Sequence, residues 1–242
     1  MQQRYFLEVS YKGEGYSGFQ SQENAVTIQS ELEKAFTILQ RSSVQMTGSS
    51  RTDAGVHALQ NFLHFDFSEE LNPQFIYKMN AILPASIVVK SINKVDADAH
   101  CRFDAKSRSY QYFLYQQKDP FLEDRAYYFP YSIDEMMLNE AASLLKEYAD
   151  FTSFSKRNTQ VKTFQCEILQ SEWVREGDCL VYRVRANRFL RGMVRALVAT
   201  MLQVGRGKIT IQEFRDIIEA KDCTKASFAV PAHGLFLSKV DF

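Results

Sequence analysis

The sequence predicts an α+β fold built on a mainly antiparallel sheet. Stretches with strand-like alternation and stretches with helical periodicity are interleaved in both halves of the chain. Two β-prone stretches flank the turn Glu176-Gly177-Asp178, so a hairpin is expected there. The 242 residues suffice for one large domain or for two half-domains that share a core. The polar residues 96–100 mark the best boundary, giving an N-terminal half of residues 1–100 and a C-terminal half of residues 101–242.

The N-terminal half opens with a predicted strand, because Tyr5, Leu7, Val9 and Tyr11 recur at every second position. The glycine-rich residues 12–22 predict a loop. The other elements expected in this half are a helix at 28–39, a loop at 46–55, a strand at 61–67, a helix between Pro73 and Pro84, and a strand at 87–95.

The C-terminal half contains two sites with the spacing of a capping box, which predicts where helices begin. Ser132 with Glu135 is one, and Thr210 with Glu213 is the other, opening a helix to about Ala220. The remaining expected elements are an aromatic-rich strand at 109–116, hairpin strands at 163–173 and 179–186, a helix at 188–204 with Gly205 as its C-cap, and a closing strand at 234–240.

The distribution of charge favours a polyanionic partner, although the 29 basic and 29 acidic residues give a net charge of zero. No acidic residue lies between Cys179 and Gln212, whereas the rest of the chain holds 22 basic and 29 acidic residues. Local positive potential of this kind suits nucleic-acid phosphates, and a solvated charged face is the alternative interpretation. The seven basic residues of this stretch are Arg183, Arg185, Arg188, Arg191, Arg195, Arg206 and Lys208.

Cysteine and histidine spacing indicates neither a disulfide framework nor a metal site. The four cysteines are widely separated, with no CxxC pair and no histidine at metal-ligand spacing, which favours free thiols in a reducing compartment. No run approaches the roughly 18 apolar residues of a membrane span, and the N-terminus runs directly into a strand pattern. We therefore expect a cytoplasmic protein without membrane contact.

Three segments carry candidate chemistry. In the loop around Asp53, Arg51 lies two positions away, so an extended backbone would point both side chains the same way and keep the carboxylate ionised. The alternative for such an aspartate is an ordinary turn residue. In the second segment the cations Arg102, Lys106 and Arg108 precede an aromatic run, a mixture that suits phosphates and bases.

The third segment is the predicted helix at 188–204. Arg188, Arg191 and Arg195 would share one face of that helix, and no acidic residue stands four positions from any of them. This arrangement favours contact with phosphates or with a carboxylate over a solvated charged face.

Four ordered motifs resemble the bacterial tRNA pseudouridine synthase A family, and together they cover nearly the whole chain. They are Arg51-Thr52-Asp53-Ala54-Gly55-Val56-His57-Ala58, Arg108-x-Tyr110-x-Tyr112, Asn187-x-Phe189-Leu190-x-x-Met193-Val194-Arg195, and Pro231-Ala232-x-Gly234-Leu235-x-Leu237. Ser50 departs from the family pattern, which has glycine before the arginine. The resemblance implies two similar α/β half-domains around a central sheet flanked by helices, with the active-site cleft between them.

The resemblance also implies an activity. Members of that family convert uridine to pseudouridine at positions 38, 39 and 40 of the tRNA anticodon stem-loop, without a cofactor or metal, on a base flipped out of its stack. Asp53 would be the catalytic carboxylate, either attacking C1′ or removing the 2′-proton. Tyr110 would stack on the uracil and help move the C5 proton, and Arg195 would pair with Asp53.

Further roles follow from the same resemblance. Arg51 would fill the vacated stack or hold a phosphate, and Leu235 would pack against the flipped base. A homodimer is implied, with tRNA as the partner. Alternatives are a synthase of the same family acting on other RNA uridines, a non-catalytic RNA-binding module, and an acid–base enzyme for a small molecule. The residues expected to contact the RNA backbone are Arg188, Arg191, Lys106 and Arg108.

Overall fold

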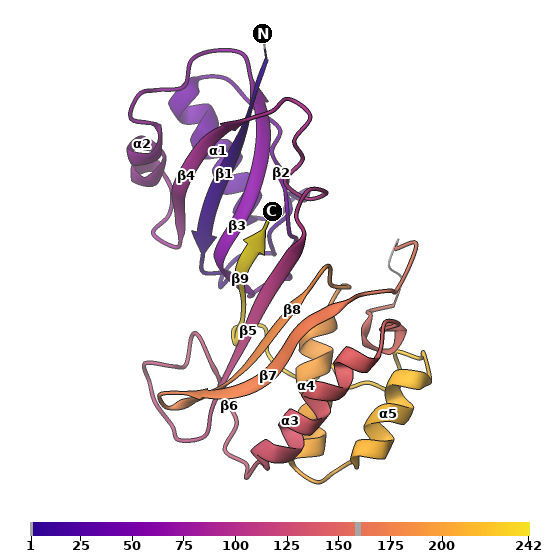
Figure 1. Ribbon diagram of the computed structural model, residues 1–242. Helices are drawn as coiled ribbons and strands as arrows, with labels where there is room; N and C mark the ends of the chain where they lie inside the picture. Colours follow the sequence, from indigo (N-terminus) through magenta and orange to yellow (C-terminus); the bar gives the residue numbers. More distant parts are fainter. Residues whose placement is uncertain (1, 158–160) are drawn as a thin grey trace. The chain divides into compact units, whose positions relative to one another are not determined.

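The computed structural model describes residues 2–157 and 161–242 and divides the chain into two compact units (Figure 1). Unit 1 comprises Met1–Lys106 and Phe236–Phe242, and unit 2 comprises Ser107–Leu235. The predicted boundary at residue 100 lies six residues before this division, and the last seven residues of the chain belong to unit 1. Each unit combines helices with mainly antiparallel strands, which confirms the predicted α+β class.

Unit 1 has the connectivity βαββαβ. Its sheet order is β4-β1-β3, with the short β2 also paired to β3, so the four strands follow the spatial order 4-1-3-2 of a ferredoxin-like fold. The last strand of the chain, β9 (Leu235–Asp241), pairs in parallel with the start of β3. The other elements are β1 (Gln3–Tyr11), α1 (Ile28–Gln40), β2 (Thr47–Gly48), β3 (His57–Phe67), α2 (Phe75–Ile82) and β4 (Ile87–Val95).

Unit 2 repeats the beginning of this pattern. A first strand and a helix are followed by a hairpin and a further helix, and the strand order β5-β8-β7 corresponds to β1-β3-β2 of unit 1. The prediction of two similar half-domains is thereby confirmed. The elements are β5 (Ser107–Tyr115), β6 (Tyr127–Tyr128), α3 (Glu135–Leu144), the 3-10 turns η1 (Leu145–Glu147) and η2 (Thr152–Phe154), β7 (Ile168–Glu176), β8 (Cys179–Ala186), α4 (Met193–Gly205) and α5 (Ile211–Glu219).

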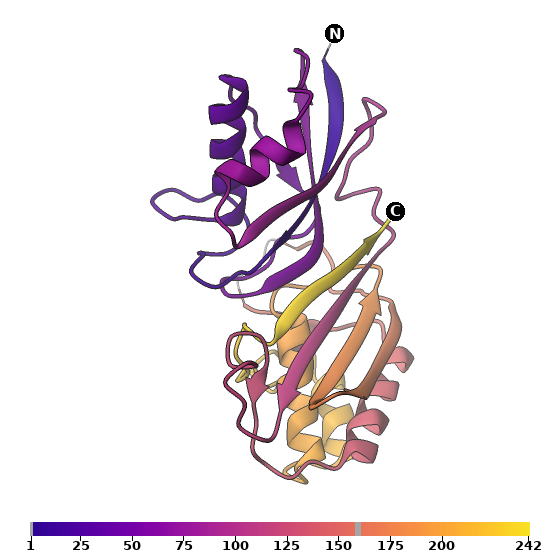
Figure 2. The same cartoon turned by 90° about the vertical axis from the view of Figure 1, so that its left-hand side faces the viewer.

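In unit 1 the helices lie on one side of the strands, as Figure 2 shows, and α1 buries an aromatic core there. Thr27 and Ser30 form a capping box that starts α1, because each side chain satisfies a backbone N–H of the other residue. One turn before its end, the Phe36 ring meets Phe65 and Phe67 of β3 edge-on, with centroids 5.1 and 5.2 Å apart.

Asparagine side chains cover the outer strand of each unit's sheet. In unit 1, Asn80 of α2 accepts from the Val89 N–H at 2.8 Å and donates to the Val89 carbonyl at 2.9 Å. In unit 2, Asn139 of α3 makes the same pair of bonds with Trp173 of β7, at 2.8 and 3.1 Å. Because β4 and β7 each end the strand order of their unit, these amides complete ladders that a neighbouring strand would otherwise fill.

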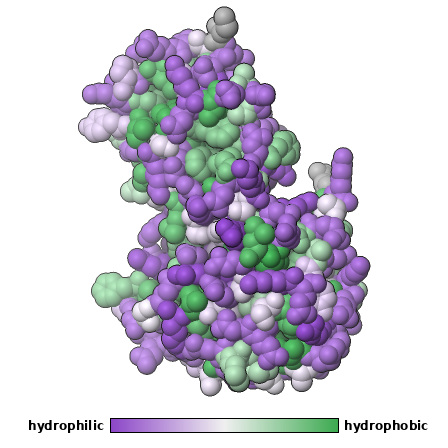
Figure 3. All heavy atoms as spheres, in the orientation of Figure 1, coloured by the Kyte–Doolittle hydropathy of each residue, from purple (hydrophilic) through white to green (hydrophobic). Residues whose placement is uncertain are grey.

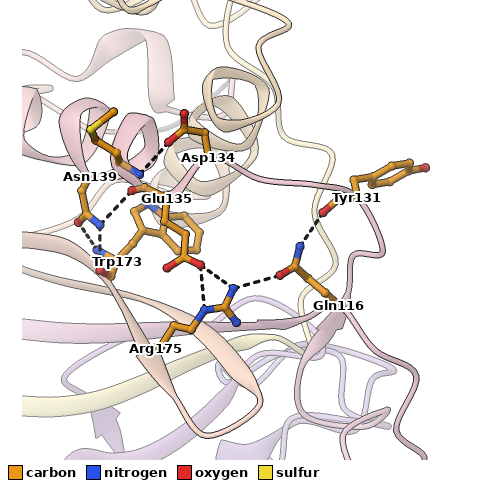
Figure 4. A network of polar contacts seen from close by, with 8 residues as sticks. Gln116, Tyr131, Asp134, Glu135, Asn139, Trp173 and Arg175 are labelled. Atoms are coloured by element: carbon orange, nitrogen blue, oxygen red, sulfur yellow. Dashed lines mark hydrogen bonds and ion pairs between the residues drawn. The ribbon is translucent and has the colours of Figure 1, made fainter.

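The start of α3 is joined to the sheet of unit 2 by further polar contacts (Figure 4). Arg175 of β7 pairs with Glu135 and also donates to Gln116, which donates to the Tyr131 carbonyl. The N-cap of α3 is Asp134, whose carboxylate accepts from two backbone N–H groups. The predicted capping box of Ser132 with Glu135 is therefore wrong, since an aspartate one position before Glu135 performs the capping. The second capping box, of Thr210 with Glu213, is confirmed at the start of α5.

The helix predicted at 188–204 begins five residues later, at Met193. Gly192 is its N-cap and has a left-handed backbone with φ of 75°, which ends the preceding loop and starts the helix. Arg188 and Arg191 therefore precede α4, and the prediction that they share a helix face with Arg195 is wrong. At the other end Gly205 is the last helical residue, whereas Arg206 is the C-cap.

The surface of each unit is mainly polar. Figure 3 shows hydrophilic side chains over most of the visible face, interrupted by small apolar patches. Large exposed apolar side chains occur in both units, among them Tyr77, Phe103, Phe121 and Met136. Within residues 2–157 and 161–242, no helix has the length and apolar character needed to cross a membrane.

Candidate active site

The segment Ser50–Val56, here called the carboxylate loop, carries Asp53 between β2 and β3 in unit 1. A buried asparagine on β3 holds its start: the Asn61 side-chain amide donates to the Ser50 carbonyl at 3.0 Å and to the Tyr11 hydroxyl at 3.2 Å. The Tyr11 hydroxyl in turn lies 2.9 Å from the Thr52 hydroxyl. Because Asn61 and Thr52 are buried, these bonds fix the carboxylate loop on both sides of Arg51.

The glycine-rich loop predicted at residues 12–22 lies against the carboxylate loop. The Phe19 N–H donates to the Thr52 carbonyl at 3.1 Å. Gly18 has a φ of 95°, and a Cβ atom there would stand 3.1 Å from the same carbonyl. At Gly13 a Cβ atom would lie only 2.0 Å from the Val56 carbonyl oxygen. Glycine is required at these positions because the two backbones touch, and this contact positions Asp53.

Asp53 itself is half-buried and opens a tight turn. Its carbonyl accepts from the Val56 N–H at 3.1 Å, and Gly55 in this turn has a φ of 78°. Ser50 stands where the motif described above usually has glycine. It is buried and does not have a positive φ, so its side chain is accommodated without backbone strain. Arg51 is exposed, and its pKa is lowered by desolvation and by the charge of Arg102.

In unit 2, Tyr110 lies on β5 opposite Val184 of β8. Its half-buried ring meets the Phe189 ring edge-on, with centroids 5.0 Å apart. Phe189 lies three residues after the end of β8, the strand that pairs with β5, which brings it to Tyr110. The contact orients the Tyr110 ring, as a surface for stacking requires.

Tyr112, two residues along the same strand, is fully buried and lies under the segment of residues 228–234, here called the strap. Its hydroxyl donates to the Pro231 carbonyl at 2.9 Å, and burial raises its pKa, so the hydroxyl stays a donor. Gly234 allows the close approach: a Cβ atom there would stand 2.9 Å from the Tyr112 ring and 2.9 Å from the Phe113 carbonyl. The strap leads directly to the buried Leu235.

Arg195, on the first turn of α4, binds the neighbouring carbonyl of the strap. Its Nε and Nη2 atoms donate to the Val230 carbonyl oxygen at 3.0 and 2.6 Å. A guanidinium has five N–H donors in a planar fork, so these two bonds fix its plane while the Nη1 edge keeps its own donors. Arg195 and Tyr112 thus hold successive carbonyls of one segment.

The remaining predicted site residues are spread over both units. Arg108 donates to the Asn187 carbonyl at 3.2 Å, whereas Lys106 is exposed and belongs to unit 1. Arg188 lies near the Cys166 thiol, whose pKa it lowers against the larger raising effect of burial. Arg191 is exposed, and its carbonyl accepts from the Lys156 N–H at 3.0 Å.

Unit 1 therefore holds Asp53 and Arg51, and unit 2 holds Tyr110, Arg195 and Leu235. Within unit 2, Arg195 binds the strap that leads to Leu235, and Tyr110 lies on β5, two residues before the Tyr112 that also binds the strap. The sequence prediction missed the contribution of Tyr112, although its place two residues after Tyr110 puts both side chains on one face of β5.

Two similar α/β units, one with an ordered carboxylate loop and one with an oriented tyrosine and a clamped arginine, have the features expected of a pseudouridine synthase. The family model described as tRNA pseudouridine synthase matches residues 8–104 and 141–242. This chain belongs to that family.

Relatives from three bacteria resemble the chain over nearly its full length, and each of them is named tRNA pseudouridine synthase A. The relative from Parabacteroides distasonis is 47% identical over 241 residues, covering 99% of this chain and 96% of its own. The relative from Porphyromonas gingivalis is 43% identical, covering 98% and 96%. The relative from Staphylococcus aureus is 38% identical, covering 98% and 90%.

Proposed function

We propose that this chain isomerises uridine to pseudouridine at positions 38, 39 and 40 of the anticodon stem-loop of tRNA. The observation that carries the proposal is the ordered carboxylate loop, which presents Asp53 in a chain that belongs to the tRNA pseudouridine synthase family. The reaction breaks the N1–C1′ bond of uridine and joins C5 to C1′. The C5 proton leaves and N1 gains one, so no oxidant, group donor or cofactor is consumed.

Asp53 supplies the essential carboxylate in this proposal. It acts on the ribose by attacking C1′ or by removing the 2′-proton, and either route needs the ionised form. Arg195 pairs with Asp53 through the edge of its guanidinium that does not face Val230, which keeps the carboxylate charged and oriented.

Tyr110 stacks on the flipped uracil, and its hydroxyl assists removal of the C5 proton. Leu235 packs against the other side of the base, and Arg51 fills the vacated stack or holds a phosphate. RNA backbone contacts come from Arg188, Arg191, Lys106 and Arg108. Since each protomer carries a basic region, a homodimer would present that region twice to one tRNA. We place the protein in the cytoplasm, where tRNA is modified.

Replacing Asp53 by asparagine tests the proposal. Release of tritium from tRNA labelled at C5 of uridine should fall by about a thousand-fold or more, because an amide neither attacks carbon nor accepts the proton. Binding of tRNA should stay within a few-fold of the parent. Asp98→Asn, a matched change at an exposed aspartate of unit 1, should leave tritium release unchanged. Full activity in Asp53→Asn would contradict the assignment.

A further inference from the structure

A pocket of about 330 Å³ opens on unit 2, beside the strap. Its volume lies at the lower end of the roughly 300–1,000 Å³ typical of ligand sites. Two of the described lining residues are cations, one is aromatic and none is acidic. The lining residues are Ser155, Lys156, Arg157, Cys223, Thr224 and Phe228. A single phosphate with its attached nucleoside matches both the size and the chemistry of this lining.

Lys156 is positioned by Arg191 and Gly192, the two residues that precede α4. Its N–H donates to the Arg191 carbonyl at 3.0 Å. Its aliphatic stem lies along Gly192, where a Cβ atom would stand 3.1 Å from the lysine Cγ and 3.2 Å from its Cε. The preceding Ser155 is buried. The backbone of Lys156 is therefore held in place, and its aliphatic stem is covered by Gly192. Lysines packed in this way expose mainly their ammonium group.

Another part of the lining, Cys223 and Thr224, belongs to a tight turn that begins with the carboxylate of Asp222. Asp222 accepts from the Thr224 N–H at 2.9 Å and from the Thr224 hydroxyl at 2.8 Å, and its own N–H donates to Ser153 at 3.0 Å. Those bonds from Thr224 are the main cause of the lowered pKa of Asp222, with smaller contributions from the charges of Lys225 and Arg157. Asp222 thus serves the turn, and the charges of two cations, Lys225 and Arg157, act on it.

The pocket is joined to the predicted catalytic residues of unit 2 by the strap. The Val230 N–H donates to the Phe228 carbonyl at 2.9 Å, and the Val230 carbonyl is the one that Arg195 binds. Phe228 and Val230 are two residues apart, which limits their separation along the chain to about 7 Å. The aromatic wall of the pocket therefore lies next to the clamped arginine.

We propose that this pocket binds one further nucleotide of the RNA substrate, close in the strand to the uridine that is isomerised. Its phosphate lies between Lys156 and Arg157, and its base or ribose lies against Phe228. Arginine supplies a two-pronged contact to phosphate oxygens and lysine a point charge, while an aromatic face accepts any base. This inference rests on the proposed function in so far as RNA is the substrate.

The salt dependence of tRNA binding tests the phosphate contact. In an Asp53→Asn background, Arg157→Gln should weaken binding of an unmodified tRNA transcript several-fold and lower the slope of log affinity against log salt by about 0.7 to 0.9. Arg125→Gln is the matched control, because Arg125 is an exposed arginine of unit 2 that pairs with Asp124. An Arg157→Gln slope equal to that of the control would overturn the phosphate contact.

Replacement of the aromatic wall tests the nucleoside contact. Phe228→Leu keeps an apolar side chain but removes the ring, so the affinity for tRNA should fall by about five-fold or more while the salt slope stays unchanged. An affinity within two-fold of the parent would overturn the stacking contact.

Cys223 provides a second and independent reporter. It lines the pocket and is partly exposed, whereas Cys101, Cys166 and Cys179 are buried. Saturating tRNA should slow alkylation of Cys223 by a maleimide at least about five-fold, and Cys223→Ser should abolish the rapid labelling. Protection by free uridine monophosphate but not by tRNA would show a small-molecule site and overturn the proposal. Equal labelling with and without tRNA would overturn it as well.

These outcomes are separable from failure of the proposed function. If the wild-type chain releases no tritium from tRNA, the isomerase assignment fails, whatever the pocket variants do. If the wild-type chain is active and the Arg157→Gln and Phe228→Leu variants bind tRNA like the parent, only the pocket assignment fails.

Discussion

At Tyr112, one buried hydroxyl connects a central strand of unit 2 with the strap that carries Leu235. The Tyr112–Pro231 bond spans 119 positions in sequence, and the Arg195–Val230 bonds span 35. Together they hold two successive carbonyls, so the geometry of the strap depends on both side chains. Removing either donor leaves one strap carbonyl without its hydrogen-bond donor. The strap would then be less well held near β5, the strand that carries Tyr110, the predicted base-stacking residue.

Tyr112→Phe should lower the free energy of unfolding by about 1–2 kcal/mol, because the Pro231 carbonyl loses a buried donor. It should also lower turnover of tRNA, since the strap that leads to Leu235 loses its bond at Pro231 and keeps only the Arg195 bonds at Val230. The matched control is Tyr182→Phe, which removes an equally buried hydroxyl bonded to Ser171 at 2.8 Å on β7. Urea unfolding and tritium release measure the two effects. Equal turnover in both variants would show that the clamp serves stability alone.

Among the elements, the outer strands β4 and β7 are completed by helix side chains. Asn80 and Asn139 each satisfy one N–H and one carbonyl of a strand that has a neighbour on only one side in its unit. This arrangement blocks pairing with other chains at the centre of each outer strand, and it fixes the register of a helix on its sheet. The amide is the suitable group, because it offers a donor and an acceptor side by side.

Replacing either asparagine by alanine should destabilise its own unit by about 1–3 kcal/mol, since two hydrogen bonds to a buried residue, Val89 or Trp173, are lost. Hydrogen exchange locates the effect. Asn139→Ala should speed exchange of the Trp173 amide and leave the Val89 amide unchanged, and Asn80→Ala should do the reverse. Each variant is the control for the other. Uniform acceleration in both units would contradict a local role for these amides.

Local signals predicted most elements, and contacts distant in sequence decided the rest. Alternation from Tyr5 to Tyr11 and the box of Thr210 with Glu213 are encoded within a few residues, and both are confirmed. The start of α4 was mispredicted because Phe189 and Leu190 extend its apolar periodicity backwards, although the left-handed Gly192 separates them from the helix. Periodicity does not report such a turn.

The candidate site shows the same division. Motifs predict its residues, and their catalytic roles stay predictions; the structure shows that the carboxylate loop is held by hydrogen bonds from neighbouring segments. The bonds of Tyr112 and Arg195 to the strap were not predictable, because they join residues that only the fold brings together. The pocket beside Phe228 was also missed, since its two walls come from segments about 67 positions apart in sequence.

For the whole molecule, the two units differ in their response to acid. His64 of unit 1 is buried, with Nδ1 3.2 Å from the Cys101 sulfur and its ring 4.5 Å from that of His100. Burial lowers its pKa from 6.5 to about 4, and the charges of His100 and Arg4 act in the same direction. Between these two pH values the unfolded chain binds a proton that the folded chain does not, so stability falls as pH falls from 6.5 towards 4.

Acidification from pH 6.5 to 4.5 should therefore cost unit 1 roughly 2–3 kcal/mol through His64, whereas the lowered carboxyl pKa values of unit 2, at Asp150 and Asp222, act only below about pH 4. Hydrogen exchange, corrected for its intrinsic pH dependence, should show protection falling in β1 and β3 before β7 and β8. His64→Gln keeps a polar side chain that does not titrate, so it should remove this difference. Parallel loss of protection in both units of the wild type would contradict the assignment to His64.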